Sequence, residues 1–209
     1  MSISNSAVEQ TINKLFEDYL NSDSEDYYSI RNALAMLCKE NIESFIKLTK
    51  DPDPLKRRCA FETLGSINDQ AVYLTLLIGL EDKDQYVREK AILYIDKFLD
   101  FRAVEPLIKA LKDPNYIVRR FAAKSLGKLS DPSIIEHLFF TAINDKDEWV
   151  KVHAASSLAK LNDRRAENLL EEITENKIYD SAVTSYARQS LFEFRKIKLV
   201  KTSDSKKVN

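Results

Sequence analysis

Glycine and proline are scarce in this chain of 209 residues, which contains three glycines and five prolines. So few turn-forming residues exclude a hairpin-rich β fold, and no glycine-rich loop is present to bind phosphate. Cysteine and histidine are equally rare, and Cys38 and Cys59 have neither a CxxC spacing nor a histidine beside them. A zinc or redox site is therefore not expected. Leu, Ala, Lys, Glu and Ile are common, and their helix propensities predict an all-α fold.

An excess of charge of one sign is also absent, because 32 Lys and Arg nearly cancel 33 Asp and Glu. Neither a general nucleic-acid-binding surface nor a polybasic membrane anchor is expected from this balance. The longest uncharged stretch, residues 70–80, is much shorter than the ~20 apolar residues that span a bilayer. The first residues lack a basic segment followed by an apolar one, so we expect no secretory signal and no membrane insertion.

An internal repeat is the strongest feature of the sequence. Four segments begin with an aspartate and start 31, 31 and 32 residues apart. A period of this length is typical of stacked helix pairs. The repeated positions are the leading Asp (Asp51, Asp82, Asp113, Asp145), a cation (Arg57, Arg88, Arg119, Lys151), an alanine (Ala60, Ala91, Ala122, Ala154) and a second Asp (Asp69, Asp100, Asp131, Asp163).

Each repeat predicts two helices. Apolar residues recur every three or four positions between Ile117 and Leu129, which indicates one helix, and a second periodic run covers residues 134–142. We expect the leading Asp to cap the first helix and the second Asp to cap the second helix. The alanine allows neighbouring first helices to approach closely. Successive pairs are expected to stack into a right-handed α-solenoid with one continuous core.

The repeat boundaries predict a single array over residues 1–200. A degenerate unit covers residues 1–50, with its first helix near residues 8–20. Repeats follow over residues 51–81, 82–112, 113–144 and 145–176, and a C-terminal cap over 177–200 includes a helix at 181–197. Residues 201–209 are polar and are predicted to be a disordered tail.

The repeat resembles the HEAT-repeat superfamily, in the short variety called phycobilisome-lyase-type HEAT-like repeats. The third repeat carries residues of the family's repeat pattern in the same order: Val118-Arg119, Ala122-Ala123, Leu126-Gly127, Leu129 and Asp131. The resemblance covers residues 34–191 and implies an α-solenoid of HEAT-like helix pairs. The same repeat builds bilin lyases, phycobiliprotein biogenesis factors, phycobilisome degradation factors, an iron hydroxylase, DNA repair glycosylases and scaffolds, so fold alone does not choose between these functions.

Small single-array members of this kind look most like phycobilin lyases of the E/F type and phycoerythrin biogenesis proteins of the Z type. The resemblance implies a phycobilin lyase subunit, or a chaperone-like factor, that assists covalent bilin attachment to a phycobiliprotein α or β subunit. It further implies a heterodimer with a second HEAT-like lyase subunit, a phycobilin as transferred substrate with no permanently bound cofactor, and a location near phycobilisomes in the cyanobacterial cytoplasm or plastid stroma. The alternative is a noncatalytic scaffold or adaptor, including a phycobilisome disassembly factor.

The repeated cations have two interpretations. They form a line that could clamp propionates, or they could pair with the second Asp of adjacent repeats as a structural ladder. Arg58 and Arg120 have no counterpart in every repeat and are the better binding candidates. Aromatic residues near the start of the first helices, with Tyr27 and Tyr28, could stack on a tetrapyrrole or pack in the core. The candidate bilin- or partner-binding residues are Arg58, Arg88, Arg119, Arg120, Tyr86, Tyr116 and Trp149.

The two histidines are His137 and His153. His137 is the candidate proton donor, because it lies on a second helix, and second helices line the concave face in proteins that this chain resembles. It could share that face with Tyr73, Glu105 and Lys109. The chain has no His-Glu dipeptide, which excludes the iron hydroxylase, and its pI near 6.2 argues against a glycosylase. No other catalytic residue and no metal ligand is predicted.

Overall fold

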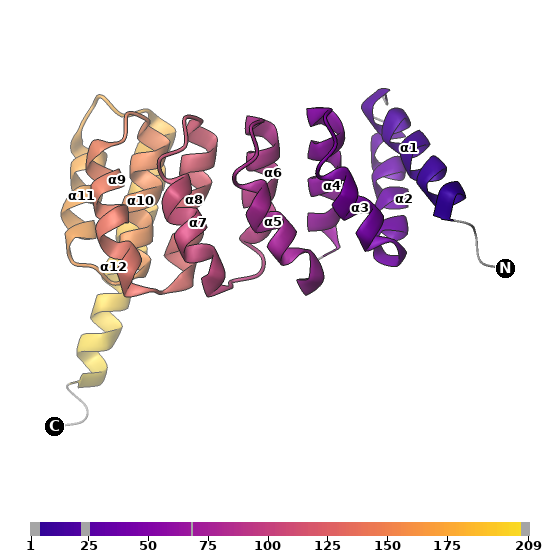
Figure 1. Ribbon diagram of the computed structural model, residues 1–209. Helices are drawn as coiled ribbons and strands as arrows, with labels where there is room; N and C mark the ends of the chain where they lie inside the picture. The colour runs from indigo at the N-terminus through magenta and orange to yellow at the C-terminus, as the bar shows by residue number, and fades with distance from the viewer. Residues whose placement is uncertain (1–4, 22–25, 68, 206–209) are drawn as a thin grey trace. The chain divides into compact units, whose positions relative to one another are not determined.

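The computed structural model describes residues 5–21, 26–67 and 69–205 (Figure 1). Every regular element in these ranges is helical, which confirms the all-α prediction. The α-helices are α1 (Asn5–Asn21), α2 (Asp26–Glu40), α3 (Ile42–Leu48), α4 (Pro54–Ser66), α5 (Tyr73–Gly79), α6 (Gln85–Ile95), α7 (Val104–Ala110), α8 (Tyr116–Leu129), α9 (Ile135–Asn144), α10 (Glu148–Lys160), α11 (Arg165–Glu175) and α12 (Ser181–Ser205). Short 3₁₀ turns, η1 (Gln70–Val72), η2 (Phe101–Ala103) and η3 (Pro132–Ile134), precede α5, α7 and α9.

The chain divides into two compact units, residues 1–98 and 99–209. The division falls inside the repeat predicted over residues 82–112, between α6 and α7. The other three predicted repeats each lie within one unit, with their helix pairs α4 and α5, α8 and α9, and α10 and α11. Within each unit the helices stack in chain order, as in an α-solenoid.

The first unit is built around α4, which packs against α2, α3 and α6. The rings of Phe16 and Phe45 meet in its core with centroids 5.9 Å apart. Tyr73 is also fully buried, with its ring 5.2 Å from that of Phe98. Tyr73 was predicted to lie on the binding face beside His137, and its complete burial shows that this prediction is wrong.

The second unit is built around α10, which packs against α8, α9, α11 and α12. Apolar residues at helical spacing on these helices fill the core. The layer of first helices contains α8, α10 and α12, and α9 and α11 form the layer of second helices. The fully buried residues include Val118, Leu126, Leu138, Leu158, Leu170 and Val183.

α12 extends to Ser205, so the prediction of disorder from residue 201 is wrong for residues 201–205. Neither glycine nor proline occurs between Ser181 and Ser205 to end the helix. Lys198 of α12 also binds Glu167 of α11 at 2.6 Å, close to the predicted helix end. The remainder of the predicted tail, residues 206–209, lies outside the described residues.

The leading aspartates do not cap the first helices, contrary to the prediction. In the third repeat the cap is Asn115, whose Oδ1 accepts the N–H groups of Ile117 and Val118 at 2.7 and 3.3 Å. Asp113 instead accepts the N–H of Asn115 at 2.8 Å and orders the turn that precedes the helix. Asp53, Asp84 and Asp147 cap the other first helices, and Asp51, Asp82 and Asp145 hold the turns before them.

The caps predicted before the second helices are confirmed at the 3₁₀ turns. Asp69 accepts the N–H of Ala71, and Asp131 accepts that of Ser133, each at 2.8 Å. The small residues of the repeat are buried as expected. A Cβ added at Gly127 would lie 2.9 Å from Cα of Ser157, so α8 and α10 meet backbone to backbone at this position.

Among the described residues, three non-glycine residues in the turns that follow first helices adopt positive φ: Leu99 at 50°, Ser130 at 53° and Asn162 at 60°. All three directly precede the second Asp of their repeat. The left-handed region costs L-residues roughly 1–2 kcal/mol and is best tolerated by Gly and Asn. Leu99 is the strained member, and its side chain is exposed and therefore contributes little packing.

Leu99→Asn is accordingly expected to raise the free energy of unfolding by about 0.5–1 kcal/mol. Urea denaturation followed by circular dichroism would measure the change. Asn162→Leu is the reciprocal control and should lower the same quantity. An unchanged or lower stability for Leu99→Asn would contradict strain at this position.

Candidate functional site

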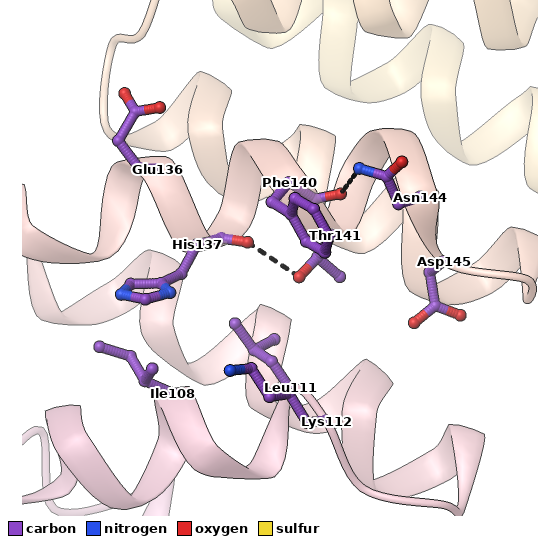
Figure 2. Close-up of a pocket in the computed structure, with 9 residues that line it drawn as sticks. All are labelled: Ile108, Leu111, Lys112, Glu136, His137, Phe140, Thr141, Asn144 and Asp145. Carbon is purple, nitrogen blue, oxygen red and sulfur yellow. Dashed lines mark hydrogen bonds between the residues drawn. The ribbon is translucent and has the colours of Figure 1, made fainter.

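An apolar groove of about 410 Å³ lies between α7 and α9 in the second unit (Figure 2). Ile108 of α7 and Leu111, which directly follows α7, line one side of the groove, and the exposed side of α9 lines the other. Phe140 is 65% exposed, which leaves a large aromatic ring in solvent at the groove. The lining residues are Ile108, Leu111, Lys112, Glu136, His137, Phe140, Thr141, Asn144 and Asp145.

The helical repeat of α9 brings four of these side chains to one face, because His137, Phe140, Thr141 and Asn144 are three or four residues apart. The hydroxyl of Thr141 donates to the carbonyl of His137 at 2.8 Å. The amide of Asn144 donates to the carbonyl of Phe140 at 2.9 Å. Two polar side chains thus turn back to the helix backbone, and the groove presents mainly apolar surface.

His137 is exposed, and Figure 2 shows its imidazole pointing toward Ile108 of α7. An imidazole at this place could exchange a proton with a ligand in the groove. Glu136 lies at the rim of the groove, and its carboxylate accepts hydrogen bonds from Arg165 at 2.8 and 3.2 Å. Its negative charge is therefore paired. The cation lining the groove is Lys112, whereas the sequence had suggested Lys109.

The repeated arginines form a structural ladder, but with different partners from those predicted. Arg119 is buried, and its Nε and Nη2 donate to Asp145 at 2.7 and 2.9 Å. Its Nη1 donates to the carbonyl of Asp113 at 2.9 Å. Arg57 binds Asp82 in the same way, with both distances 2.8 Å. The partner is therefore the leading Asp of the next repeat.

This geometry corrects the binding assignment of Arg119. Each of its three nitrogens, Nε, Nη1 and Nη2, donates to Asp145 or to a backbone carbonyl. A buried guanidinium in that state cannot clamp a propionate. Arg88 is half-buried, and its Nη1 donates to the carbonyl groups of Asp82 and Lys83 at 2.9 and 3.3 Å.

Arg58 and Tyr86 come together in the first unit, where the guanidinium lies 5.6 Å from the ring centroid. Tyr86 is 50% exposed, so the alternative of core packing is wrong for this residue. Tyr116, in the second unit, is exposed to a similar extent. Of the other aromatic candidates, Tyr28 is exposed and Tyr27 points its hydroxyl to Glu62.

Trp149 lies in a cluster of three rings in the second unit. Its indole is 6.0 Å from the imidazole of His153 and 6.3 Å from the ring of Tyr186. Burial lowers the pKa of His153 to about 4, and the positive charges of Arg120 and two lysines act in the same direction. Arg120 therefore lies near this cluster, with its guanidinium over the ring of Phe121. His153 is neutral at pH 7.

A buried polar network around Glu62 escaped sequence reasoning. The carboxylate accepts hydrogen bonds from the hydroxyls of Tyr19 and Tyr27, each at 3.1 Å, and pairs with Lys90 at 2.7 Å. It joins α1, α2, α4 and α6. The same repeat position carries Leu93, Lys124 and Ser156, so no apolar pattern is broken at Glu62 and the repeat held no signal for this network.

Within the described ranges, no group of three His, Cys, Asp or Glu side chains is placed to hold a metal ion. Cys38 and Cys59 are buried, and burial raises the pKa of the Cys38 thiol to about 12. That thiol is therefore unreactive at neutral pH. Across the same described ranges, no helix combines the length and apolarity needed to cross a membrane.

Known proteins share both the sequence pattern and the architecture. The chain is 28% identical over 160 residues to the uncharacterized phycocyanin operon protein Z of Pseudanabaena tenuis, covering 72% of this chain and 76% of that protein. It is 26% identical over 230 residues to the AP-1 complex subunit beta-1 of Homo sapiens, covering 92% of this chain. The match covers 24% of the AP-1 subunit, so this chain spans about a quarter of that relative's length.

A solved structure, the complex of CpcE and CpcF of phycocyanin lyase from a Nostoc species, matches 73% of this chain and 98% of that chain with a TM-score of 0.56. The sequence identity in that match is 22%, so the match supports the solenoid fold alone. The family model of HEAT repeats matches residues 73–139 and 104–191, which together exceed half of the chain. The chain therefore belongs to the HEAT-repeat family.

Proposed function

We propose that this protein binds a phycobiliprotein α or β subunit through the groove between α7 and α9 and assists covalent attachment of a phycobilin to it. It would act as a lyase subunit or as a chaperone-like factor. The observation that carries the proposal is the groove itself, an apolar surface with Phe140 exposed, His137 along its wall and Lys112 in its lining. Likeness to phycocyanin operon protein Z over most of both chains supports a phycobiliprotein as the occupant.

The chemistry to be assisted is an addition. A cysteine thiolate of the phycobiliprotein forms a C–S bond to the ethylidene carbon of the bilin, and the electron pair of the C=C bond takes up a proton at the adjacent ring carbon. No oxidant is needed and no group leaves. His137 is the groove residue suited to deliver that proton, and Lys112 could bind a propionate. The bilin is the substrate in this scheme and is not a resident cofactor.

The test is co-expression with phycobiliprotein α and β subunits in cells that make a bilin, followed by a denaturing gel read for covalent bilin fluorescence. The assay is run with and without this protein, and with and without a second HEAT-like lyase subunit. A fluorescent subunit band that depends on this protein supports participation in ligation. More soluble subunit without covalent pigment supports a chaperone. If this protein produces neither the fluorescent band nor more soluble subunit, the proposal is contradicted.

Groove variants locate the activity. Phe140→Ser is expected to reduce subunit binding by roughly tenfold or more, because an exposed aromatic anchor is lost. Phe192→Ser is the matched control, since Phe192 is 70% exposed on α12, away from the groove lining. His137→Gln should slow covalent attachment by about 100-fold if His137 is the proton donor, while leaving subunit binding intact. Equal effects of Phe140→Ser and Phe192→Ser would argue against the groove.

A noncatalytic scaffold is the second candidate. It is favoured by the arginine ladder, which is occupied by structural contacts at Arg57 and Arg119, and by the match to a subunit of the AP-1 complex. A scaffold would bind its partner through the same groove but leave bilin attachment unchanged.

On the first proposal the protein works beside phycobilisomes, in a cyanobacterial cytoplasm or a plastid stroma, and pairs with a second HEAT-like lyase subunit.

A further inference from the structure

A second surface in the same unit combines cations with aromatic rings. We call it the cationic-aromatic patch and define it by six residues on the first-helix layer. α8 contributes two cations, α10 an aromatic pair and a lysine, and α12 a tyrosine; α10 packs against both of the other helices (Figure 1). The members are Arg120, Lys124, Trp149, His153, Lys160 and Tyr186.

The rings form the centre of the patch. His153 and Tyr186 are 4.6 Å apart between centroids, with an angle of 54° between their planes. Trp149 lies one helical turn before His153 on α10. Because the rings tilt against one another, they leave no parallel slot for a flat ligand, and they present edges and faces to a partner surface.

Within the part of the chain that the structure describes, the cations around these rings have no acidic partner. Among the described residues, Arg120, Lys124 and Lys160 form no ion pair. α8 as a whole contains four cations and no acid. Glu148, the acid at the start of α10, accepts the backbone N–H of Asp180 at 3.2 Å. All three cations act on His153 electrostatically, so their positive potential converges on the ring cluster.

The repeat itself does not require these cations. The position of Arg120 is occupied by Arg58, Glu89 and Val152 in the other repeats, and that of Lys124 by Glu62, Leu93 and Ser156. Bringing like charges together opposes folding, so the cluster is not explained by stability. Its positive charge and its half-buried rings, which remain partly open to solvent, together are the features of a binding surface.

We propose that the cationic-aromatic patch is a docking surface for an acidic segment of a partner protein, separate from the groove between α7 and α9. Charge complementarity selects the partner, since unpaired cations meet carboxylates with favourable long-range attraction. The rings would contact the apolar parts of the same segment. A nucleic acid is the less suitable polyanion, because the chain as a whole has a net charge of −1.

The experiment uses Trp149, the single tryptophan of the chain, as a built-in reporter. The full chain is titrated with a peptide of alternating glutamate and glycine, and with its glutamine counterpart. We expect the glutamate peptide to change Trp149 fluorescence, with an affinity that falls as salt is raised. It should also raise the pKa of His153 in an NMR titration, because carboxylates would then offset the charges of Arg120, Lys124 and Lys160.

Arg120→Gln combined with Lys124→Gln should weaken peptide binding by roughly tenfold or more. The matched control is Lys177→Gln with Lys196→Gln, which removes the same charge from exposed positions of the same unit and should change affinity by less than about twofold. Thermal unfolding by circular dichroism checks that each variant is folded. The proposal fails if the peptide affects neither Trp149 nor His153, if the control loses as much affinity, or if a single-stranded oligonucleotide of equal charge binds more tightly.

Discussion

Replacement of Arg119 by methionine is expected to lower the free energy of unfolding by about 3–5 kcal/mol. The change leaves the carboxylate of Asp145, whose side chain is 7% exposed, without its bidentate partner. It also removes the hydrogen bonds to the carbonyl groups of Asp113 and Pro114. Buried charges that lose their partner retain the full cost of desolvation, and methionine fills the volume but supplies no donor. Urea denaturation of the full chain would measure the loss.

The adjacent residue offers a matched control. Arg120→Met removes the same charge from the same helix, but Arg120 has no ion pair among the described residues. Its cost should be less than about 1 kcal/mol. Adding Asp145→Asn to Arg119→Met should recover part of the stability, because the amide oxygen can still accept the N–H of Asp147. Equal losses for Arg119→Met and Arg120→Met would contradict a structural ladder.

The ladder also shows where sequence reasoning stopped short. The period identifies the repeated cation, which is Arg57 in the first repeat. Two aspartates, Asp69 and Asp82, recur with the same period, and the prediction that the partner is the Asp69 position is wrong. Arg57 lies in the first turn of α4, whereas Asp69 follows the helix end, and 13 residues separate those ends by roughly 20 Å. Asp82 begins the next repeat, where the chain has come back to the end of α4 at which Arg57 lies. Helix length could therefore have decided between the two partners.

The groove was less predictable. α9 is apolar on several sides, with Leu138 and Ala142 buried but Phe140 and Ile143 exposed. Periodicity cannot say which apolar residues of such a helix face the core, because that depends on how α9 packs against its neighbours. The polar residues His137 and Thr141 were visible in the sequence. Their place beside Ile108 of α7 is a property of the packed unit.

The Glu62 network makes the second large stability prediction. Glu62→Ala is expected to lower the free energy of unfolding by about 2–4 kcal/mol. The substitution leaves the hydroxyls of Tyr19 and Tyr27 and the ammonium of Lys90 without their common acceptor, in the interior of the first unit. Glu43→Ala, at an exposed position on α3, is the control and should change stability by less than about 0.5 kcal/mol.

The stabilisation by Glu62 should depend on pH in a defined direction. Burial by itself raises the pKa of Glu62, but the hydrogen bond and charge of Lys90 and the two tyrosine hydroxyls outweigh it, and the net pKa is lowered. Since an unfolded glutamate has a pKa of about 4.3, the stabilisation is complete above that pH and is lost as the pH falls through the lower folded value. The stability difference between wild type and Glu62→Gln, measured in urea, should therefore shrink from pH 7 to pH 3. A difference that stayed constant would mean that Glu62 does not act as a carboxylate, and the pairing with Lys90 would then contribute nothing to the fold.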